Sequence, residues 1–412
     1  MLPFVLWLAS AAVAGIQAYS ALTREPSDRL ADLSVYVGAA QDLLRTGSLY
    51  DFITANDAPF TYPPFAGLLM VPLANLDLGV LQVLWTLATI LVVYALAVAV
   101  SRLIGGVPER WRNLVAPALA LVLFASAPVS SNIRFGQVSV FLAFALVAAC
   151  ARLRAGADRS AGVLVGITAA IKLTPLLFVP GLFLAKRRAA WAAIGTFAVA
   201  TAIAAAILFH DSVRFWAHEI WNVNRVGHIT TNGNQSFNGV LLRLGVAESA
   251  RTIAVLVFLA AIGSIAIYRF HVLASRAQWL PAFIVLGCAT VAVSPVSWTH
   301  HQVWLVLAVA LPIGAAGTRR ALWIAAVILI TVLPLASLSL HLPTPVDFLL
   351  REARFLLTTA IAALLPLGVR NGHREEIPDQ RITDDEPGRR AYPGAYAQPR
   401  RPRRWPYADR PQ

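Results

Sequence analysis

The sequence predicts an all-α protein that crosses a membrane many times. Of its 412 residues, 58% are hydrophobic and only 13% are charged, whereas soluble domains carry roughly 25% charged residues. Apolar runs of about 20 residues, the length that a helix needs to cross a bilayer, recur along nearly the whole chain. The segments between these runs are polar, and many of them contain arginines. We therefore expect a helical, polytopic membrane protein.

The formal net charge of +13 is explained by membrane topology. The arginines lie in short clusters between apolar runs, as expected for loops on the cytoplasmic side. We therefore expect a lipid bilayer, and no nucleic acid, as a partner. Cys150 and Cys288 lie inside apolar runs, where a buried small hydrophobic role is commoner than a disulfide or a metal site. We expect no cofactor and a monomer; the sequence leaves a metal requirement and the oligomeric state open.

The first half of the chain contains a helix, a long external loop and further spans. We interpret the first apolar run as a retained helix, because no basic segment of a signal peptide precedes it. Residues 161–185 are interrupted by Lys172, Thr174 and Pro175. We expect two short half-helices that meet at Lys172, because broken helices are tolerated where they line a cavity. The other expected spans of this half are residues 2–21, 78–100, 115–130 and 138–151.

The second half continues the alternation of spans and polar loops. Counting residues 62–76 as a juxtamembrane helix keeps the basic clusters on one side of the membrane, which gives about twelve spans with both termini cytoplasmic. The external loops are then residues 23–77 and 210–250. Residues 1–370 form the membrane domain, and residues 371–412, which lack apolar periodicity, form a disordered cytoplasmic tail. The expected spans are residues 189–209, 251–268, 279–293, 303–316, 321–340 and 353–369.

This topology places the polar residues of the apolar region on one side of the membrane. The topology was derived from apolar runs and basic clusters alone. The placement of these polar residues on one side is therefore an independent observation. It predicts a polar site that faces away from the cytoplasm. The residues expected on that side are Asp32, Asn132, Arg134, Lys172, His210, Asn232, Gly233, Asn234, Gln235, His300 and His301.

Asp32 is the first candidate catalytic residue. It follows the first apolar helix closely, so its carboxylate is able to reach a reaction held at the membrane surface while staying solvated. A general base needs a carboxylate within hydrogen-bond reach of the hydroxyl that it deprotonates. The alternative role for Asp32 is the N-cap of the helix that follows it. Four acids compete with it in the same region: Asp28, Asp42, Asp51 and Asp57.

The basic residues are candidates for binding an anion. Lys172 lies between apolar stretches, where a lysine is costly unless it is paired or faces a polar cavity. A phosphate would neutralise it, and the same argument applies to Arg134. The alternative for Lys172 is that its ammonium reaches the membrane interface. His300 and His301 are able to donate to a phosphate or polarise a leaving group; a metal is less favoured, because adjacent histidines project in different directions.

Trp298 lies near the end of a span, where a tryptophan anchors at the membrane interface more often than it stacks on a sugar. The chain contains no P-loop, GxSxG, HExxH or dinucleotide-binding fingerprint. ATP-driven transport and serine hydrolysis therefore lack support from the sequence.

The chain contains an ordered set of short blocks: DLSVY at 32–36, LY at 49–50, FTYPPF at 60–65, GQ at 136–137, IKLTP at 171–175, NQS at 234–236 and SPVSWTHH at 294–301. Each block alone is weak, whereas FTYPPF and SPxSWxHH in this order are specific. The set resembles the actinobacterial polyprenyl-phosphate-mannose-dependent mannosyltransferases of glycosyltransferase family 87, over about residues 1–370. The resemblance implies the GT-C fold.

The resemblance also implies a reaction. It is an inverting α-(1→2)-mannosyl transfer from polyprenyl phosphate mannose to a glycolipid on the outer face of the plasma membrane. The acceptors in the family include phosphatidylinositol mannosides, to which a fifth mannose is added, and lipomannan and lipoarabinomannan. The family's catalytic aspartate falls on Asp32. We expect Lys172, Arg134, His300 and His301 to bind the donor phosphate, and we expect substrate contacts from Tyr36, Tyr62, Asn234, Gln235 and Trp298.

Two other classes of function remain as alternatives. A transporter or flippase of a polyprenyl-linked sugar is also a multispan protein with polar residues at mid-depth, but it predicts repeats between the two halves. The large loops at 23–77 and 210–250 have no matching partners. A structural or assembly subunit would need neither Asp32 nor Lys172.

Overall fold

The computed structural model describes residues 1–313, 317–338 and 343–366. Within these ranges the protein is helical and has no strand; Ile53 and Pro59 form one isolated bridge. The predicted tail, residues 371–412, lies outside the described residues. The helices of the first half are α1 (Leu2–Leu22), α2 (Ala31–Thr46), α3 (Pro64–Met70), α4 (Leu78–Leu103), α5 (Glu109–Ala125), α6 (Ala127–Phe135), α7 (Ser139–Arg154), α8 (Asp158–Ile171), α9 (Phe178–Ala185) and α10 (Arg187–Ile207).

The second half contains shorter helices around two long ones. Single turns of 3-10 or π geometry link several of them, such as Val71–Leu73, Thr174–Leu177, Phe215–Glu219 and Thr299–His301. The α-helices are α11 (Phe209–Arg214), α12 (Phe237–Arg243), α13 (Glu248–Ser275), α14 (Trp279–Val293), α15 (Val303–Leu307), α16 (Thr318–Val332), α17 (Leu335–Leu338), α18 (Thr344–Arg351) and α19 (Ala353–Thr359).

Four helices of the described ranges, α1, α4, α10 and α13, are long and apolar enough to cross a bilayer. The pair α5 and α6, bent by 64°, makes a fifth if it counts as one span. Shorter apolar helices, including α14, occupy several of the other predicted spans. The membrane character is therefore confirmed, and the count of about twelve spans stays a prediction.

Proline and lysine positions set several helix ends as expected. Within residues 62–76, helix α3 begins at Pro64 and a 3-10 turn follows it; the juxtamembrane position of this segment stays a prediction. The predicted break at Lys172 is also confirmed. Helix α8 ends at Ile171, and Lys172 is extended (φ −147°, ψ 128°). A 3-10 turn and α9 then resume the helical path.

The region predicted as a span at residues 303–316 differs from the expectation. Helix α15 covers only Val303–Leu307, and a 3-10 turn follows it. Leu311 then becomes extended (ψ 139°), because it precedes Pro312 and the residue before a proline disfavours helical geometry. Residues 314–316 lie outside the described ranges. The apolar run is therefore divided by a local proline effect.

Close helix packing holds the scaffold together. Helices α8 and α10 pack through Gly162 and Gly166, which are spaced four residues apart on α8, as in small-residue packing motifs of membrane proteins. An added Cβ at Gly162 would lie 2.1 Å from the carbonyl oxygen of Ala189. Helix α14 lies in the centre, and nearly all of its residues are buried. It leads directly into residues 294–301, one of the blocks noted in the sequence.

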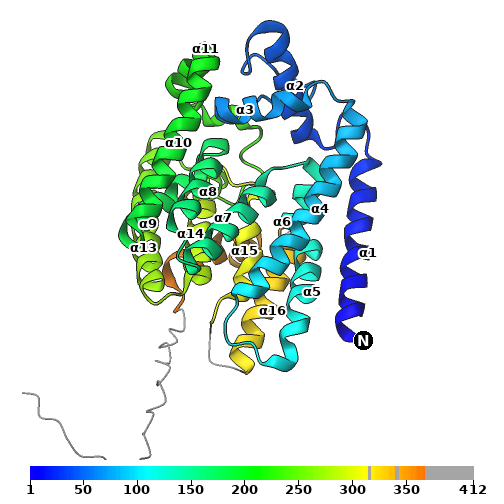
Figure 1. Ribbon diagram of the computed structural model, residues 1–412, viewed down its shortest axis with the longest axis vertical. Coiled ribbons are helices and arrows are strands. Elements are labelled where there is room, and N and C mark those ends of the chain that lie inside the picture. The colour runs from blue at the N-terminus through cyan, green and yellow to red at the C-terminus, as the bar shows by residue number, and fades with distance from the viewer. Residues whose placement is uncertain (314–316, 339–342, 367–412) are drawn as a thin grey trace, which may run out of the picture. The chain divides into compact units, whose positions relative to one another are not determined.

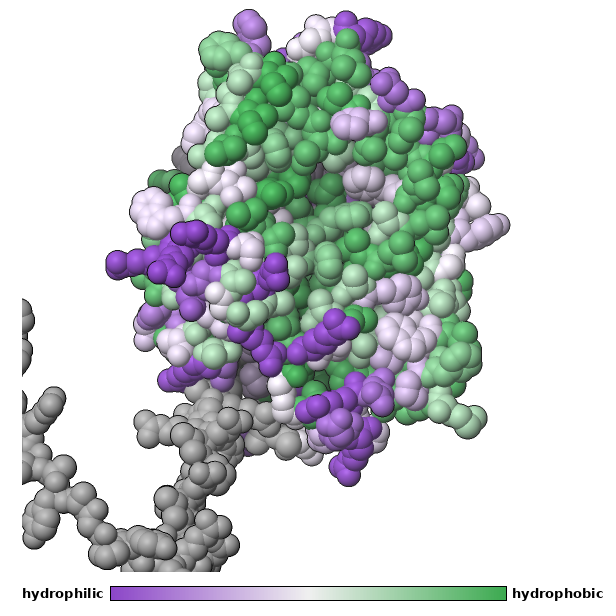
Figure 2. Space-filling model, viewed as in Figure 1, coloured by the Kyte–Doolittle hydropathy of each residue, from purple (hydrophilic) through white to green (hydrophobic). Residues whose placement is uncertain are grey.

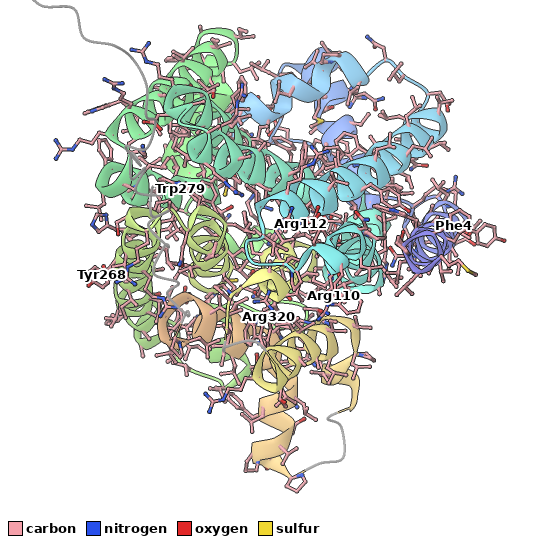
Figure 3. The ribbon with its side chains drawn as sticks, turned by 60° about the horizontal axis from the view of Figure 1, so that its bottom comes forward. Phe4, Arg110, Arg112, Tyr268, Trp279 and Arg320 are labelled. Carbon is pink, nitrogen blue, oxygen red and sulfur yellow. The ribbon has the colours of Figure 1, made fainter. Side chains whose placement is uncertain are left out.

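The two ends of the helical domain differ in character. Helices α2, α3 and α11 gather at one end, at the top of Figure 1, and α1 begins at the other end. Apolar side chains cover most of the face in Figure 2, and hydrophilic ones gather toward its ends. Figure 3 brings the bottom forward and shows Arg110, Arg112 and Arg320 there, while Phe4 points outward at the side. Helix α2 at the first end carries the predicted site residues Asp32 and Tyr36.

Candidate active site

The carboxylate of Asp32 lies in the first turn of α2. The helix begins after Leu30, whose φ of 44° is unusual for a residue with a side chain, so Asp32 is not the N-cap. Its Oδ2 accepts a hydrogen bond of 2.5 Å from the side-chain amide of Gln137. The two residues are brought together by Gly136 (φ 68°), at which a Cβ would lie 2.8 Å from the Cβ of Leu33. This close approach requires glycine.

The amide of Gln137 is oriented by two tyrosines. Tyr62 donates from its hydroxyl to Oε1 of Gln137 at 3.1 Å. Tyr36 donates in turn to the hydroxyl of Tyr62 at 3.0 Å. Because Oε1 of Gln137 is an acceptor here, its Nε2 is the atom that faces Asp32. The predicted residues Tyr36 and Tyr62 therefore belong to a chain of hydrogen bonds that ends on the carboxylate.

Lys172 approaches the same chain from the break between α8 and α9. Its Nζ lies 3.4 Å from the hydroxyl of Tyr62 and 2.7 Å from Nε2 of His301. The backbone N–H of Trp298 donates to Nδ1 of His301 at 3.1 Å, so the ring is held with Nε2 toward the lysine. No carboxylate pairs with Lys172 in residues 1–313, 317–338 and 343–366. An anionic ligand would supply the missing charge.

His300 lies beside this pair without taking part in it. Its ring packs edge-on against Phe135, with centroids 6.0 Å apart, and against His301 at 4.5 Å. Its backbone carbonyl accepts from the amide of Asn132 at 2.8 Å. No group of three or more His, Cys, Asp or Glu within the described ranges is arranged to hold a metal ion.

These side chains line one cavity of about 740 Å³. This volume lies in the range of roughly 300–1,000 Å³ that is typical of small-molecule sites. Its walls come from segments far apart in the sequence, which include five of the seven blocks noted above. Predicted residues that line it are Asp32, Tyr36, Tyr62, Lys172, Trp298, His300 and His301.

The environment of Asp32 suits a base. Burial raises the pKa of this carboxyl from 3.8 to about 6, against the lowering effects of the Gln137 hydrogen bond and the charge of Lys172. A carboxylate with such a pKa is still ionised at neutral pH, and it accepts a proton more readily than an ordinary aspartate.

The competing acids are placed differently. Asp42 pairs with Arg45 at 2.7 Å, and Asp51 pairs with Arg214 at 2.5 Å. Only Asp57 among the competitors also lines the cavity. The structure therefore leaves Asp32 and Asp57 as the two aspartates at this site.

Three predicted residues do not line the cavity. Arg134 lies at the end of α6, with its guanidinium 4.9 Å from the ring of Phe135, and it lines a neighbouring cavity. Asn234 and Gln235 are buried and bind backbone groups. Oδ1 of Asn234 accepts from the N–H of Ser297 at 2.9 Å, and the N–H of Gln235 donates to the carbonyl of Ser297 at 2.8 Å. In this structure they hold the segment that carries Trp298.

The sequence analysis missed a basic and an acidic residue in the cavity wall. Arg225 pairs with Glu219 and donates to the carbonyl of Phe60. Its guanidinium also lies 5.6 Å from the ring centroid of Tyr50. Both charged residues come from the loop predicted at residues 210–250, where neither interrupts an apolar run. No pattern in the sequence therefore distinguished them from solvated loop residues.

Comparison with known proteins adds independent information. Residues 60–295 match glycosyltransferase family 87. The chain is 31% identical over 367 residues to the polyprenol-phosphate-mannose-dependent alpha-(1-2)-phosphatidylinositol mannoside mannosyltransferase of Mycobacterium tuberculosis, with 84% of this chain and 82% of the relative covered. It is 32% identical over 285 residues to the polyprenol-phosphate-mannose-dependent alpha-(1-2)-phosphatidylinositol pentamannoside mannosyltransferase of Mycolicibacterium smegmatis, with 67% of each chain covered.

Proposed function

The chain belongs to glycosyltransferase family 87, and on this basis we propose that it transfers mannose from polyprenyl phosphate mannose to the 2-hydroxyl of a glycolipid mannoside, with inversion at the anomeric carbon. The observation that carries the proposal is the cavity in which Asp32 and Lys172 lie on one chain of hydrogen bonds. A base for the incoming hydroxyl and a cation for the departing phosphate are thereby present in one site.

Asp32 acts as the general base. Its Oδ2 is held by Gln137, and Oδ1 has no hydrogen-bond partner among the described residues, so it is available to the acceptor. The acceptor oxygen attacks the anomeric carbon while its proton passes to Asp32. The bond from that carbon to the phosphate oxygen breaks, and its electron pair stays on the phosphate. Attack from the face opposite the phosphate inverts the configuration.

Lys172 and His301 stabilise the leaving group. The phosphodiester of the donor becomes a monophosphate, so one negative charge develops on the departing oxygen. Positioned donors act most strongly where charge develops in the transition state. Because a lipid phosphate leaves more readily than a sugar hydroxyl, the reaction needs no second carboxylic acid as a proton donor. In the structure, Nζ of Lys172 is also 5.3 Å from the ring centroid of Tyr62, which keeps it at the cavity wall.

The acceptor that we propose is a phosphatidylinositol mannoside, extended from four to five mannoses. The relatives support the class of acceptor. The names of these relatives differ in the mannoside, whereas their identities to this chain, 31% and 32%, are nearly equal. Lipomannan or lipoarabinomannan, the other acceptors considered in the sequence analysis, is the alternative. We also propose that the cavity faces the cell exterior, because arginines gather at the opposite end (Figure 3) and basic clusters favour the cytoplasm.

The test is transfer by the purified protein from polyprenyl phosphate mannose to a short phosphatidylinositol mannoside. Asp32→Asn should lower kcat by about 10²- to 10⁴-fold, the usual contribution of a general base. Asp77→Asn is the matched control. Asp77 caps α4 through a hydrogen bond from Val80, and asparagine caps helices equally well, so this variant should keep its kcat.

Each contrary outcome has a definite meaning. Equal turnover by a folded Asp32→Asn variant would remove Asp32 as the base and favour Asp57, which lines the same cavity. No transfer by the wild type with several mannoside acceptors would contradict the proposed reaction and bring the transporter alternative forward.

A further inference from the structure

A second cavity adjoins the candidate active site. Its volume is about 500 Å³, and its walls come from α6, α17, α18, α19 and the loop around Gly233. Four residues line both cavities, so only a thin wall separates the two spaces. The shared residues are Ser131, Phe135, Gly233 and Thr299.

The charged residues that line this second cavity are all arginines. Arg134, Arg351 and Arg354 all line it, and no acidic residue does. Arg351 pairs with Asp347 at 2.5 Å. Arg354 lies half-buried at the start of α19, and its Nε donates a hydrogen bond to the carbonyl of Ile330 at 3.2 Å. Within residues 1–313, 317–338 and 343–366, neither Arg134 nor Arg354 forms an ion pair.

Arg354 is half-buried without a counter-ion, which is costly because its charge is partly removed from water and left uncompensated, whereas Arg134 is exposed. The planar guanidinium matches the oxygens of a phosphate in a bidentate arrangement. The chemistry of the lining therefore fits a phosphate-bearing ligand better than a neutral sugar.

The helix beside the cavity indicates where that phosphate comes from. Helix α18 presents Val346 and Leu349 to the outside, 42% and 57% exposed, while Leu350 and Arg351 line the cavity. A short amphipathic helix with an exposed apolar face lies at the surface of a bilayer. On this basis we expect the arginines at the depth of the phospholipid headgroups.

We propose that this cavity binds the phosphodiester of the glycophospholipid acceptor through Arg134 and Arg354. The acyl chains then stay in the bilayer beside α18, and the mannose chain reaches past Phe135 and Thr299 into the cavity of Asp32. This inference rests on the proposed function and extends it. It assigns Arg134 to the acceptor phosphate, whereas the sequence predicted a contact with the donor phosphate.

The kinetic test compares two acceptors, a phosphatidylinositol mannoside and a neutral alkyl α-mannoside. Arg134→Gln and Arg354→Gln should each raise KM for the phospholipid about tenfold or more, because hydrogen bonds to charged groups are strong. The kcat, the KM for the donor and the KM for the neutral acceptor should stay unchanged. Arg45→Gln is the matched control, since Arg45 is 80% exposed and lines neither cavity. Arg354→Lys should restore part of the affinity.

Two kinetic results would overturn the inference. One is an unchanged KM for the phospholipid in the folded double variant Arg134→Gln/Arg354→Gln. The other is a raised KM for the donor with an unchanged KM for both acceptors, which would return Arg134 to the donor phosphate.

A binding test separates this inference from the proposed function. Native mass spectrometry of the wild type should show retained phosphatidylinositol that the double variant loses, while retention of neutral diacylglycerol is the same in both proteins. Inorganic phosphate should compete only weakly. Equal retention by both proteins, or inorganic phosphate that binds as tightly as the lipid, would overturn the inference. This result stands even if the wild type transfers no mannose.

Discussion

Two buried charged regions of this protein are built in opposite ways. Arg243 and Glu352 form a closed ion pair, with side chains only 8% and 2% exposed and with Nη2 2.5 Å from Oε2. A second bond of 2.7 Å joins Nε to Oε1. The remaining Nη1 donates to the carbonyls of Thr231 and Asn234 at 2.9 and 3.0 Å. The chain itself thus satisfies both charges.

Asp32 and Lys172 of the candidate active site have no such ion pair among the described residues. Asp32 accepts from the neutral amide of Gln137, and within the described ranges Lys172 has Tyr62 and His301 as its hydrogen-bond partners. The two charges influence each other without forming an ion pair among the described residues. The difference teaches that burial alone does not identify a functional charge. A charge that the chain neutralises stabilises the fold, whereas an unpaired charge at a cavity is available to bind a ligand.

The largest effect is expected when the ion pair of Arg243 and Glu352 is broken. Glu352→Gln should destabilise the fold by about 3–5 kcal/mol, because Arg243 is then buried without a counter-ion. Thermal unfolding in detergent measures the change. Glu109→Gln is the control: Glu109 and Arg112 are 83% and 65% exposed, and exposed pairs contribute about 0–1 kcal/mol. A melting temperature of Glu352→Gln equal to that of the wild type would contradict the structural role of this pair.

A somewhat smaller effect, on activity alone, is expected at Lys172. Lys172→Met should lower kcat by about 10²- to 10³-fold, as expected for a group that stabilises developing charge. The melting temperature should stay the same or rise, since an unpaired buried charge is removed. Lys186→Met is the control, because the chain's other lysine lies at the C-terminal end of α9 and pairs with Asp158 at 3.7 Å. Full turnover by Lys172→Met would remove this lysine from the phosphate role.

The smallest effect is a dependence of the rate on pH. The pKa of Asp32 is raised by burial to about 6, and a base must be ionised. The kcat/KM should therefore fall about tenfold per pH unit below that value and level off above it. Gln137→Leu should move the midpoint upward, because the amide hydrogen bond lowers the pKa of Asp32. A midpoint near pH 4, or a rate that rises on acidification, would contradict Asp32 as the base.

The sequence predicted the parts of the site that depend on short-range effects. Lys172 was expected at a break between two half-helices, and the structure has it there. Polar residues in separate external loops were expected to converge, and Asp32, Tyr62 and His301 do line one cavity. The sequence could not predict which cavity Arg134 lines, because neighbouring residues of α6 face different cavities. Phe135 lines both cavities, whereas Arg134 lines only the second.

The sequence by itself determined the helical membrane class, the break at Lys172 and the helix that starts at Pro64, because hydropathy, proline geometry and the cost of a lysine in an apolar segment act locally. Only the tertiary structure decided that Gln137 holds Asp32, 105 residues away, and that Arg243 closes on Glu352, 109 residues away. Both pairings depend on how helices and loops meet in space. The close approach at Gly136 results from that packing, which no local pattern records.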